Sequence, residues 1–349
     1  MRIAVVNDSD LARQALAQVI EQSGRYRLAW AAADGQEALA RCRSDRPDVL
    51  LMDLIMPGMD GVETTRRIMA EAPCAILVVT ADVSGQAGRV FEAMGAGALD
   101  AVNTPVLGMD GAGGKELLVK LDTVARLVRA SGHPGCGGEP AAPLPDGAAG
   151  QAGENPLIAI GASTGGPAAL RRLLSLLPPD LPAAITVVQH VDTEFARSFA
   201  QWLDKELEIP VTAARPGEKP LPGRAYIAIE DRHLRLDARS RFEYRDEPRD
   251  CPYRPAVDVF FHSVATHWRG QAIGVLLTGM GKDGAEGLLA MRRAGCLTIA
   301  QDAATSAIFG MPKAAIQLDA ASRVLPLDAI APALVEAILA PGRQKTINS

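Results

Sequence analysis

The chain has 349 residues and a net charge of −5, and 48% of its residues are hydrophobic but only 4% are aromatic. This length favours two domains, and the scarcity of aromatic rings favours parallel α/β sheets over a β-sandwich. The acidic balance argues against nucleic acid or an anionic membrane as the main partner. No apolar run is long enough for membrane insertion.

The cysteines and the N-terminus both indicate a cytoplasmic protein. Five cysteines are scattered without a C-x-x-C pair, at Cys42, Cys74, Cys136, Cys251 and Cys296. Their odd number and spacing argue against a disulfide framework or a structural zinc site. The first segment, MRIAVVND, reaches Asn7 and Asp8 too early for a signal peptide.

Residues 1–130 predict a first α/β domain. Strand-like segments lie at 2–8, 27–33, 48–54, 74–82 and 98–104, and helix-like segments follow them at 11–24, 35–45, 62–72, 87–97 and 115–130. Near-continuous apolar strands that alternate with helices are typical of a doubly wound parallel sheet.

Residues 131–154, SGHPGCGGEPAAPLPDGAAGQAGE, are mainly Gly, Ala and Pro. A segment with almost no large apolar side chain cannot bury a core, so we expect a flexible linker.

The alternation resumes in residues 155–345, which predict a second doubly wound, mostly parallel α/β domain. Buried strands are expected at 157–162, 183–190, 210–216, 272–279 and 297–302, and helices at 166–177, 194–207, 257–269 and 285–295. Shorter strands at 224–229, 233–238 and 242–247 suit a hairpin or an antiparallel edge.

Polar residues follow the strands of the first domain where its chemistry is expected, because the carboxyl ends of parallel strands meet at one edge of a sheet. They are Asn7, Asp8, Asp53, Thr80, Asn103 and Thr104. Asp8 and Asp53 can hold Mg²⁺ through carboxylate oxygens, and Asp53 can attack phosphorus to give an acyl phosphate. The alternative is that these acids only cap strand ends and stay solvated.

This set of residues resembles the flavodoxin-like receiver domain of two-component response regulators. The segment LLMDLIMPGMDG matches the phosphoacceptor segment, which implies phosphorylation at Asp53, and VVTAD supplies the switch hydroxyl at Thr80. Two positions differ: Asn7 replaces the first member of an acidic pair, and Thr104 replaces a Lys that would pair with phosphoryl oxygens. Both differences bear on how efficiently phosphorylation occurs and how it is transmitted.

In the second domain, Ser163 lies in the sequence GASTGG, between an apolar strand and a helix. A serine on such a turn is exposed at the top of the sheet, and the helix N-terminus offers backbone donors to an oxyanion. The alternative is a glycine-rich turn with a capping serine.

A nucleophilic serine requires a base. Of the five histidines, only His190 follows a buried strand. His133 lies in the linker, His233 in a peripheral strand, and His262 and His267 five residues apart in a helix, which is the wrong spacing for a metal pair. We therefore favour His190 as the base over a purely structural role.

Residues 279–284, GMGKDG, fit the G-x-G-x-x-G spacing of a dinucleotide-binding turn, with Asp302 where a ribose-binding acid would lie. However, Asp283 inside that turn would repel a pyrophosphate. Asp283 at a strand end can instead orient His190, and a backbone N–H near Met280 can face an oxyanion. The chain order Ser, His, Asp differs from the order Ser, Asp, His of α/β-hydrolases, which argues against that superfamily.

Six segments together resemble the catalytic domain of chemotaxis protein-glutamate methylesterases, the CheB family. They are IAIGASTGGP, VVQH, LPGRAYIA, RPAVDVFFHSVA, GVLLTGMGKDG and FGMPKAA. The resemblance implies Ser163 as nucleophile, His190 as base and Asp283 as acid, with Thr164 and Met280 in supporting positions. It also implies hydrolysis of glutamyl γ-methyl esters on chemoreceptors, and often deamidation of receptor glutamines.

The same resemblance implies how the two domains work together. The receiver covers the Ser163 site, and phosphorylation of Asp53 by a histidine kinase of the CheA type relieves the block. Hydrolysis needs no cofactor, whereas receiver phosphorylation needs Mg²⁺. The segments VND and DAVNTP resemble the Wsp surface-sensing branch more than flagellar chemotaxis. A competing hypothesis is a non-catalytic regulatory protein that only binds a receptor or kinase.

Overall fold

The computed structural model describes residues 1–83, 85–105, 112–130, 155–191, 193–249, 251 and 253–339. It divides into two compact units, Met1–Gly137 and Gly138–Ser349, each with its own sheet. The predicted linker, 131–154, and the last predicted residues of the second domain, 340–345, lie outside the described residues.

The first unit contains a parallel sheet with the strand order β2-β1-β3-β4-β5. This is the flavodoxin-like order, so the predicted fold of this domain is confirmed. The strands are β1 (Arg2–Val6), β2 (Arg27–Ala32), β3 (Val49–Met52), β4 (Ala75–Thr80) and β5 (Asp100–Asn103).

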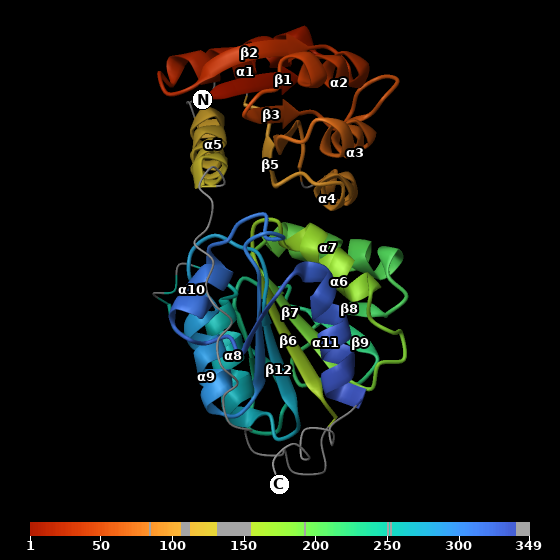
Figure 1. The fold of residues 1–349 in the computed structure, drawn as a ribbon, viewed down its shortest axis with the longest axis vertical. Helices are drawn as coiled ribbons and strands as arrows, with labels where there is room; N and C mark the ends of the chain where they lie inside the picture. The colour runs from red at the N-terminus through yellow and green to blue at the C-terminus, as the bar shows by residue number, and fades with distance from the viewer. Residues whose placement is uncertain are drawn as a thin grey trace. The chain divides into compact units, whose positions relative to one another are not determined.

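Helices cover both faces of this sheet, because its strands are apolar on both sides. Figure 1 shows α1 (Asp10–Gln22) and α5 (Ala112–Ala130) on one face, and α2 (Gly35–Ser44), α3 (Gly61–Glu71) and α4 (Ala87–Gly95) on the other. The first three helices begin at side-chain caps, where Ser9, Asp34 and Asp60 accept hydrogen bonds from backbone N–H groups three residues ahead.

The second unit contains a parallel sheet with the order β14-β13-β12-β6-β7-β9-β8. Its strands are β6 (Leu157–Ala162), β7 (Ala184–Gln189), β8 (Val211–Ala213), β9 (Arg224–Ile227), β12 (Ala272–Leu276), β13 (Leu297–Gln301) and β14 (Arg323–Leu325). The expectation of a second doubly wound, mostly parallel domain is confirmed.

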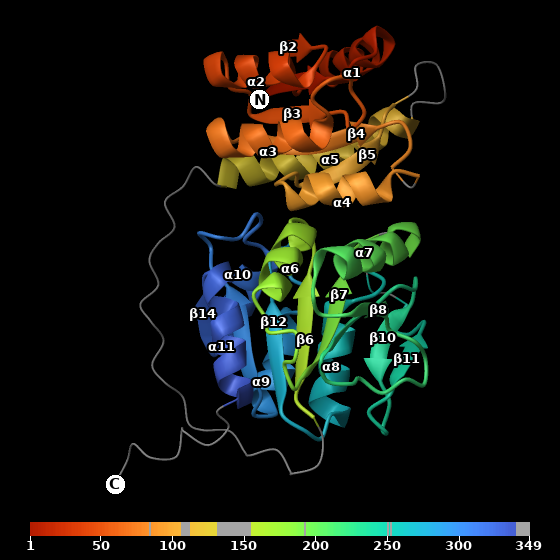
Figure 2. The same ribbon diagram turned by 90° about the vertical axis from the view of Figure 1, so that its right-hand side faces the viewer.

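Six helices flank the second sheet (Figures 1 and 2). One face is covered by α6 (Gly166–Ser175), α7 (Thr193–Glu206) and α11 (Leu327–Leu339), and the other by α8 (Val257–His267), α9 (Ala285–Arg293) and α10 (Met311–Gln317). The strands β10 (His233–Leu236) and β11 (Phe242–Arg245) form a separate antiparallel hairpin, which packs against α8. The predicted hairpin is therefore present in these two strands.

Two strands differ from the expectation. The segment 224–229, which we expected in a hairpin or at an antiparallel edge, forms β9, which pairs in parallel with β7 and β8 inside the main sheet. The segment expected as a buried strand at 210–216 forms the three-residue edge strand β8. These positions depend on pairing between distant segments, which local hydrophobic patterns do not encode.

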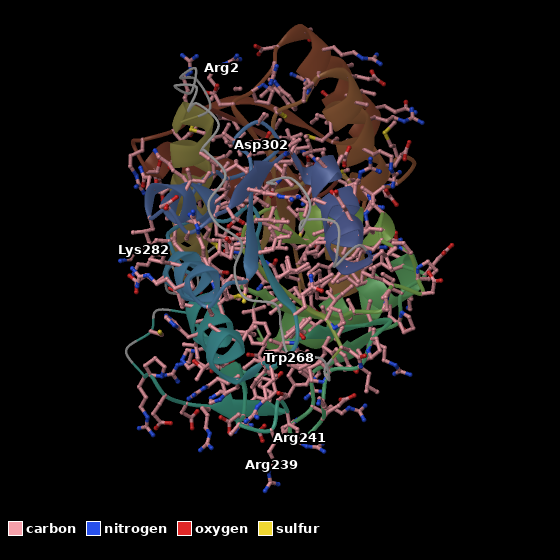
Figure 3. The ribbon with its side chains drawn as sticks, turned by 60° about the horizontal axis from the view of Figure 1, so that its bottom comes forward. Arg2, Arg239, Arg241, Trp268, Lys282 and Asp302 are labelled. Atoms are coloured by element: carbon pink, nitrogen blue, oxygen red, sulfur yellow. The ribbon has the colours of Figure 1, made fainter. Side chains whose placement is uncertain are left out.

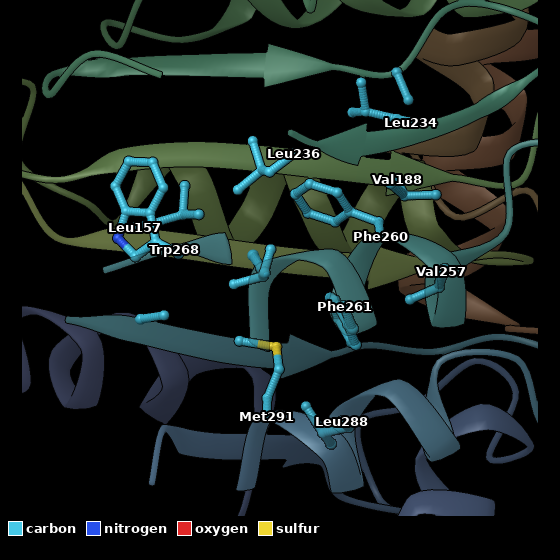
Figure 4. Packing of buried hydrophobic residues seen from close by; sticks show 14 of the residues in the cluster. Leu157, Val188, Leu234, Leu236, Val257, Phe260, Phe261, Trp268, Leu288 and Met291 are labelled. Atoms are coloured by element: carbon cyan, nitrogen blue, oxygen red, sulfur yellow. The ribbon is translucent and has the colours of Figure 1, made fainter. Parts of the chain in front are cut away.

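The core of the second unit joins the sheet, the hairpin and α8. Figure 4 shows Phe260 of α8 on the side of Leu236 and Val188, whereas Phe261 lies toward Leu288 and Met291 of α9. Burial of each apolar side chain of this size stabilises the folded state by roughly 1.5–3 kcal/mol relative to exposure. This packing holds α8 in place where its N-terminus meets the site described next. None of the described helices is both long and apolar enough to cross a membrane.

Candidate active site

Three neighbouring strands of the second sheet end at the three predicted catalytic residues. Ser163 follows β6, His190 follows β7 and Asp283 lies beyond β12, and β6 is paired with both of the other strands. His190 Nε2 and Asp283 Oδ2 are 2.7 Å apart. A Cβ atom on Gly279, in the Asp283 loop, would come within 2.8 Å of Ser163 Cβ. The fold therefore brings the three residues, separated in sequence, to one edge of the sheet.

The turn that carries Ser163 is fixed from three directions. Ser163 N donates to Thr278 O at 3.0 Å, and Ser163 O accepts hydrogen bonds from Gly166 N at 2.7 Å and from Gln189 Nε2 at 2.8 Å. Gly165 has φ of +77°, a conformation that only glycine adopts readily, and a Cβ there would lie 2.5 Å from Ala307 Cβ. The main chain is thus held in place before any substrate arrives.

Thr278 links this turn to the neighbouring loops. Its hydroxyl donates to Thr164 O at 3.1 Å and accepts from Ile308 N at 2.8 Å, and its own N–H donates to Gln301 Oε1 at 2.8 Å. Thr164, a predicted supporting residue, is therefore bound to the β12 strand end through its carbonyl oxygen.

His190 is held by one ring nitrogen and leaves the other available. Nε2 contacts Asp283, whereas Nδ1 is buried and has no hydrogen-bond partner among the described residues. With Asp283 as an anionic acceptor, Nε2 carries the proton and Nδ1 has a free lone pair. Nδ1 is then the ring atom of His190 that can accept a proton.

Asp283 is surrounded by hydrogen-bond donors. Oδ2 accepts from His190 and from Val257 N at 2.7 Å, and Oδ1 accepts from Asp258 N and from Gly284 N, each at 3.0 Å. Val257 and Asp258 are the first residues of α8, so the positive end of that helix faces the carboxylate. Burial alone raises the pKa of Asp283, but the His190 interaction and these N–H groups outweigh burial and lower it. Asp283 therefore stays ionised beside His190.

A second carboxyl group lies beside Asp283. Asp258 Oδ1 accepts a hydrogen bond from Gly287 N of α9 at 2.7 Å. Its pKa is raised to about 7, first by burial and also by the negative charge of Asp283. The lowered pKa of Asp283 thus favours its ionised form, whereas the raised pKa of Asp258 favours its protonated form.

Met280, the other predicted supporting residue, lies half-buried in the loop after β12. Gly310 N and Met311 N donate to Gly279 O at 3.1 and 2.9 Å, which fixes the start of this loop. Lys282 is exposed, and Figure 3 shows it at the periphery of the ribbon. The loop thus turns a carboxylate inward and a cation outward at successive positions.

The other predicted candidates have local structural partners. His233 is fully buried, with Nε2 3.0 Å from Pro248 O and Nδ1 3.2 Å from Ala256 N. His262 and His267 lie on α8, and His133 is outside the described residues. Asp302, the possible ribose-binding acid, accepts hydrogen bonds from Thr305 N and Oγ1 at 2.9 and 2.6 Å and so caps its own turn.

The predicted phosphoacceptor pocket lies at the carboxyl ends of the first sheet. Asp53 Oδ2 accepts from Asn7 Nδ2 at 2.8 Å, and Oδ1 accepts from Leu54 N at 2.7 Å and from Ile55 N at 3.4 Å. The Thr80 hydroxyl donates to Gln86 Oε1 at 3.1 Å, and Thr104 N donates to Thr80 O at 2.9 Å. The hydroxyl of Thr80 is therefore bound to Gln86, the N-cap residue of α4.

Asp53 has a pKa raised to about 6, mainly because it is buried and also because Asp8 is negatively charged, although two backbone N–H groups oppose this. Two neighbouring carboxylates suit a hard divalent cation such as Mg²⁺, whose charge would relieve their repulsion. No cluster of three or more His, Cys, Asp or Glu is placed to hold a metal within the described ranges. The expected Mg²⁺ site therefore depends on the carboxylates of Asp8 and Asp53. Asn7 supplies a neutral amide at the position where a third acid would lie.

Sequence reasoning missed three residues that contact the predicted triad. Gln189 holds the Ser163 turn, Asp258 lies beside Asp283, and the ring of Tyr253 stacks on His190 with centroids 4.2 Å apart and planes 7° apart. Gln189 could have been found from its place beside His190 at a strand end. Tyr253 and Asp258 come from a segment that no local pattern connects to His190.

Together the two units define a class of protein: a flavodoxin-like receiver followed by a parallel α/β domain with Ser, His and Asp at adjacent strand ends. Residues 158–334 match the CheB methylesterase family, and residues 3–109 match the response regulator receiver domain family. The chain belongs to the CheB methylesterase family.

Two relatives match almost the whole chain. A protein-glutamate methylesterase/protein-glutamine glutaminase 2 of Burkholderia lata is 52% identical, covering 98% of this chain and 100% of the relative. The corresponding protein 4 of Burkholderia thailandensis is 53% identical, covering 97% and 98%. Among solved structures, the CheB methylesterase catalytic domain of Thermotoga maritima is 39% identical, with a TM-score of 0.50, over 53% of this chain and 99% of that domain.

Proposed function

We propose that this protein is a phosphorylation-regulated protein-glutamate methylesterase that hydrolyses glutamyl γ-methyl esters on chemoreceptor-type proteins and so gives adaptation in a chemosensory pathway. The observation that carries the proposal is the buried His190–Asp283 pair beside the Ser163 turn, at the ends of three paired strands. Relatives that match the full chain carry the same activity in their names.

The reaction follows from the arrangement of donors and acceptors. His190 Nδ1 takes the hydroxyl proton as Ser163 Oγ bonds to the ester carbonyl carbon. The bond to the methoxy oxygen then breaks, and His190 returns the proton to that oxygen, which releases methanol. Water, activated in the same way, attacks the acyl-enzyme, and the side chain leaves as glutamate.

Asp283 and the supporting residues act on the charges that develop in this reaction. The ionised Asp283 stabilises the imidazolium that forms on His190. We assign the oxyanion to donors near Thr164 and Met280, whose backbones are fixed by Thr278 and by the Gly310 loop. The same steps with a primary amide release ammonia, which corresponds to the glutaminase activity named for the relatives.

Regulation is assigned to the first domain. Asp53 would attack the phosphorus of a phosphohistidine on a histidine kinase of the CheA type; the P–N bond breaks, the kinase imidazole leaves, and a C–O–P acyl phosphate forms on Asp53. Asp8 and Asp53 would hold Mg²⁺, which when bound would supply positive charge for phosphoryl oxygens. We expect the phosphorylated receiver to release a block on the Ser163 site. The boundaries 1–130, 131–154 and 155–345 remain our proposed division of the chain.

The pathway and the compartment are also proposals. The scattered cysteines favour a reducing compartment, and we place the reaction in the cytoplasm. The segments VND and DAVNTP favour a surface-sensing pathway of the Wsp type. Deletion of the gene should then change the response to surfaces, and a deletion that alters only swimming reversals would contradict the assignment.

The first experiment is to measure methanol release from a methylated receptor fragment, with and without a small phosphodonor and Mg²⁺. We expect release that increases with the donor and disappears in Ser163→Ala. Release that the donor does not change would leave the esterase but uncouple the receiver. No release from any receptor fragment, together with a Ser163→Ala strain that keeps its biological effect, would favour the non-catalytic regulatory protein.

A further inference from the structure

Tyr253 covers one face of the His190 ring. The two rings are nearly parallel, 7° apart, with centroids separated by 4.2 Å. The Tyr253 hydroxyl also lies 3.3 Å from the position that a Cβ on Gly281 would occupy. Tyr253 therefore reaches from the base to the loop that carries Met280 and Asp283.

The segment around Tyr253 is anchored on both sides. His233, fully buried on β10, contacts Pro248 O through Nε2 and Ala256 N through Nδ1. Just beyond Ala256, Val257 N and Asp258 N donate to Asp283. Described residues on both sides of Tyr253 are thus tied to the hairpin and to the triad carboxylate.

His190 needs such support, because the hydrogen bond to Asp283 fixes only one ring nitrogen. With Nε2 on Asp283 and no partner for Nδ1 in the described part of the chain, the ring can still tilt about the Nε2–Oδ2 line. A stacked aromatic ring removes this freedom and excludes water from the covered face. It also offers a π surface to the positive charge that His190 carries after it takes the serine proton.

We propose that Tyr253 is a positioning residue for His190, and that its aromatic ring, not its hydroxyl, holds the imidazole so that Nδ1 faces Ser163. This inference rests on the proposed function, in which His190 is the base. It assigns Tyr253 no contact with the reacting ester, so its effect should fall on the rate of the chemical step and not on substrate binding.

The test compares Tyr253→Leu with Tyr253→Phe in the full-length protein. The first variant removes the ring, and the second removes only the hydroxyl. The readout is the rate of phosphonylation of Ser163 by a fluorophosphonate probe at several probe concentrations, followed by methanol release from a methylated receptor fragment. The probe reacts with an activated serine without any glutamyl ester. A wild-type protein that reacts with the probe but releases no methanol would contradict the proposed function and leave this inference testable.

We expect Tyr253→Leu to lower the limiting phosphonylation rate about tenfold or more, with the half-saturating probe concentration unchanged. Tyr253→Phe should react at nearly the wild-type rate. A wild-type rate in Tyr253→Leu, an equal loss in Tyr253→Phe, or a change confined to half-saturation would each overturn the inference. Thermal unfolding of each variant checks the fold, and Tyr253→Gln replaces the Leu variant if that variant unfolds.

Discussion

Asp53 of the receiver and Asp283 of the catalytic domain are similar in position, but their pKa values are shifted in opposite directions. Both lie at the carboxyl edge of a parallel sheet, and they are 9% and 8% exposed. The pKa of Asp53 is raised to about 6, whereas the pKa of Asp283 is lowered. Burial acts in the same direction on both groups, so the difference arises from their partners.

The partners differ in number and in charge. Asp283 receives a histidine and three backbone N–H groups, two of them at the N-terminus of α8. Asp53 receives a neutral amide from Asn7 and two N–H groups, and it faces the like charge of Asp8. Asp283 is thus preorganised as a permanent anion. Asp53 has weaker compensation for its charge, so its pocket favours a bound cation that would offset the repulsion from Asp8.

The largest effect should follow from neutralising Asp283. In Asp283→Asn the side chain no longer stabilises the imidazolium and favours the wrong tautomer of His190, so we expect kcat to fall roughly 10³- to 10⁴-fold. Methanol release at saturating receptor fragment measures it. Lys282→Gln is the matched control, because Lys282 is adjacent but exposed. Loss of less than tenfold in Asp283→Asn would mean that His190 works without this carboxylate.

The corresponding change in the receiver should leave chemistry intact and remove regulation. Asp53→Asn cannot form an acyl phosphate, so the increase in methanol release caused by a phosphodonor and Mg²⁺ should vanish while basal release remains. The ratio of the rates with and without donor gives the result. Asp10→Asn, an exposed change nearby, should respond as the wild type does. A donor response that persists in Asp53→Asn would place phosphorylation elsewhere.

An acid at position 7, in place of Asn7, should increase the affinity of the receiver pocket for cations. We expect Asn7→Asp to raise Mg²⁺ affinity about tenfold, since the number of charged oxygen ligands largely sets the affinity of such sites. Calorimetric titration with Mg²⁺ measures the change. The double variant Asn7→Asp/Asp8→Asn keeps the original number of acids and should return the affinity toward wild type. Equal affinity in all three proteins would show that Asn7 already ligates the metal as well as an acid.

Within the catalytic domain, the elements differ in how well the sequence predicts them. Strand periodicity placed Ser163, His190 and Asp283 at strand ends, and the short apolar runs before them predict the three paired strands of the structure. By contrast, the place of β9 within the sheet, strand β14 and helices α10 and α11 were not anticipated. Short elements of mixed polarity carry weak local signals, and their order is set by pairing with distant strands.

The supporting residues of the site were harder to predict for the same reason. His233 bonds to Pro248 and Ala256, on either side of Tyr253 in the sequence, and Asp258 N at the start of α8 donates to Asp283. In the receiver, a sequence motif indicates which acids are present and which are replaced, but not that Asn7 donates to Asp53. The spacing of motifs and the periodicity of apolar residues do not predict contacts that arise from tertiary packing.

The smallest expected effect concerns the pH dependence of stability, and it tests whether partners or burial decide the charge of a buried acid. Asp258 has an ordinary pKa of 3.8, which the fold raises to about 7. Between these values the folded state binds more protons than the unfolded state, so the stability tied to neutral Asp258 is lost as pH rises from about 4 to about 7. Asp258→Asn stays neutral and can still accept from Gly287 N, which removes this loss.

We therefore expect Asp258→Asn to gain on the order of 1–2 kcal/mol relative to wild type between pH 4 and pH 8, a figure reduced from the full shift because Asp258 is only half-buried. Urea unfolding at both pH values gives the change. The charges of Asp283 and Glu286 both raise the pKa of Asp258. Glu286→Gln, at an exposed neighbour, is therefore the control and should shift stability by only a few tenths of a kcal/mol. Parallel pH curves for wild type and Asp258→Asn would mean that Asp258 ionises freely beside Asp283, and that the donors around Asp283 screen its charge completely.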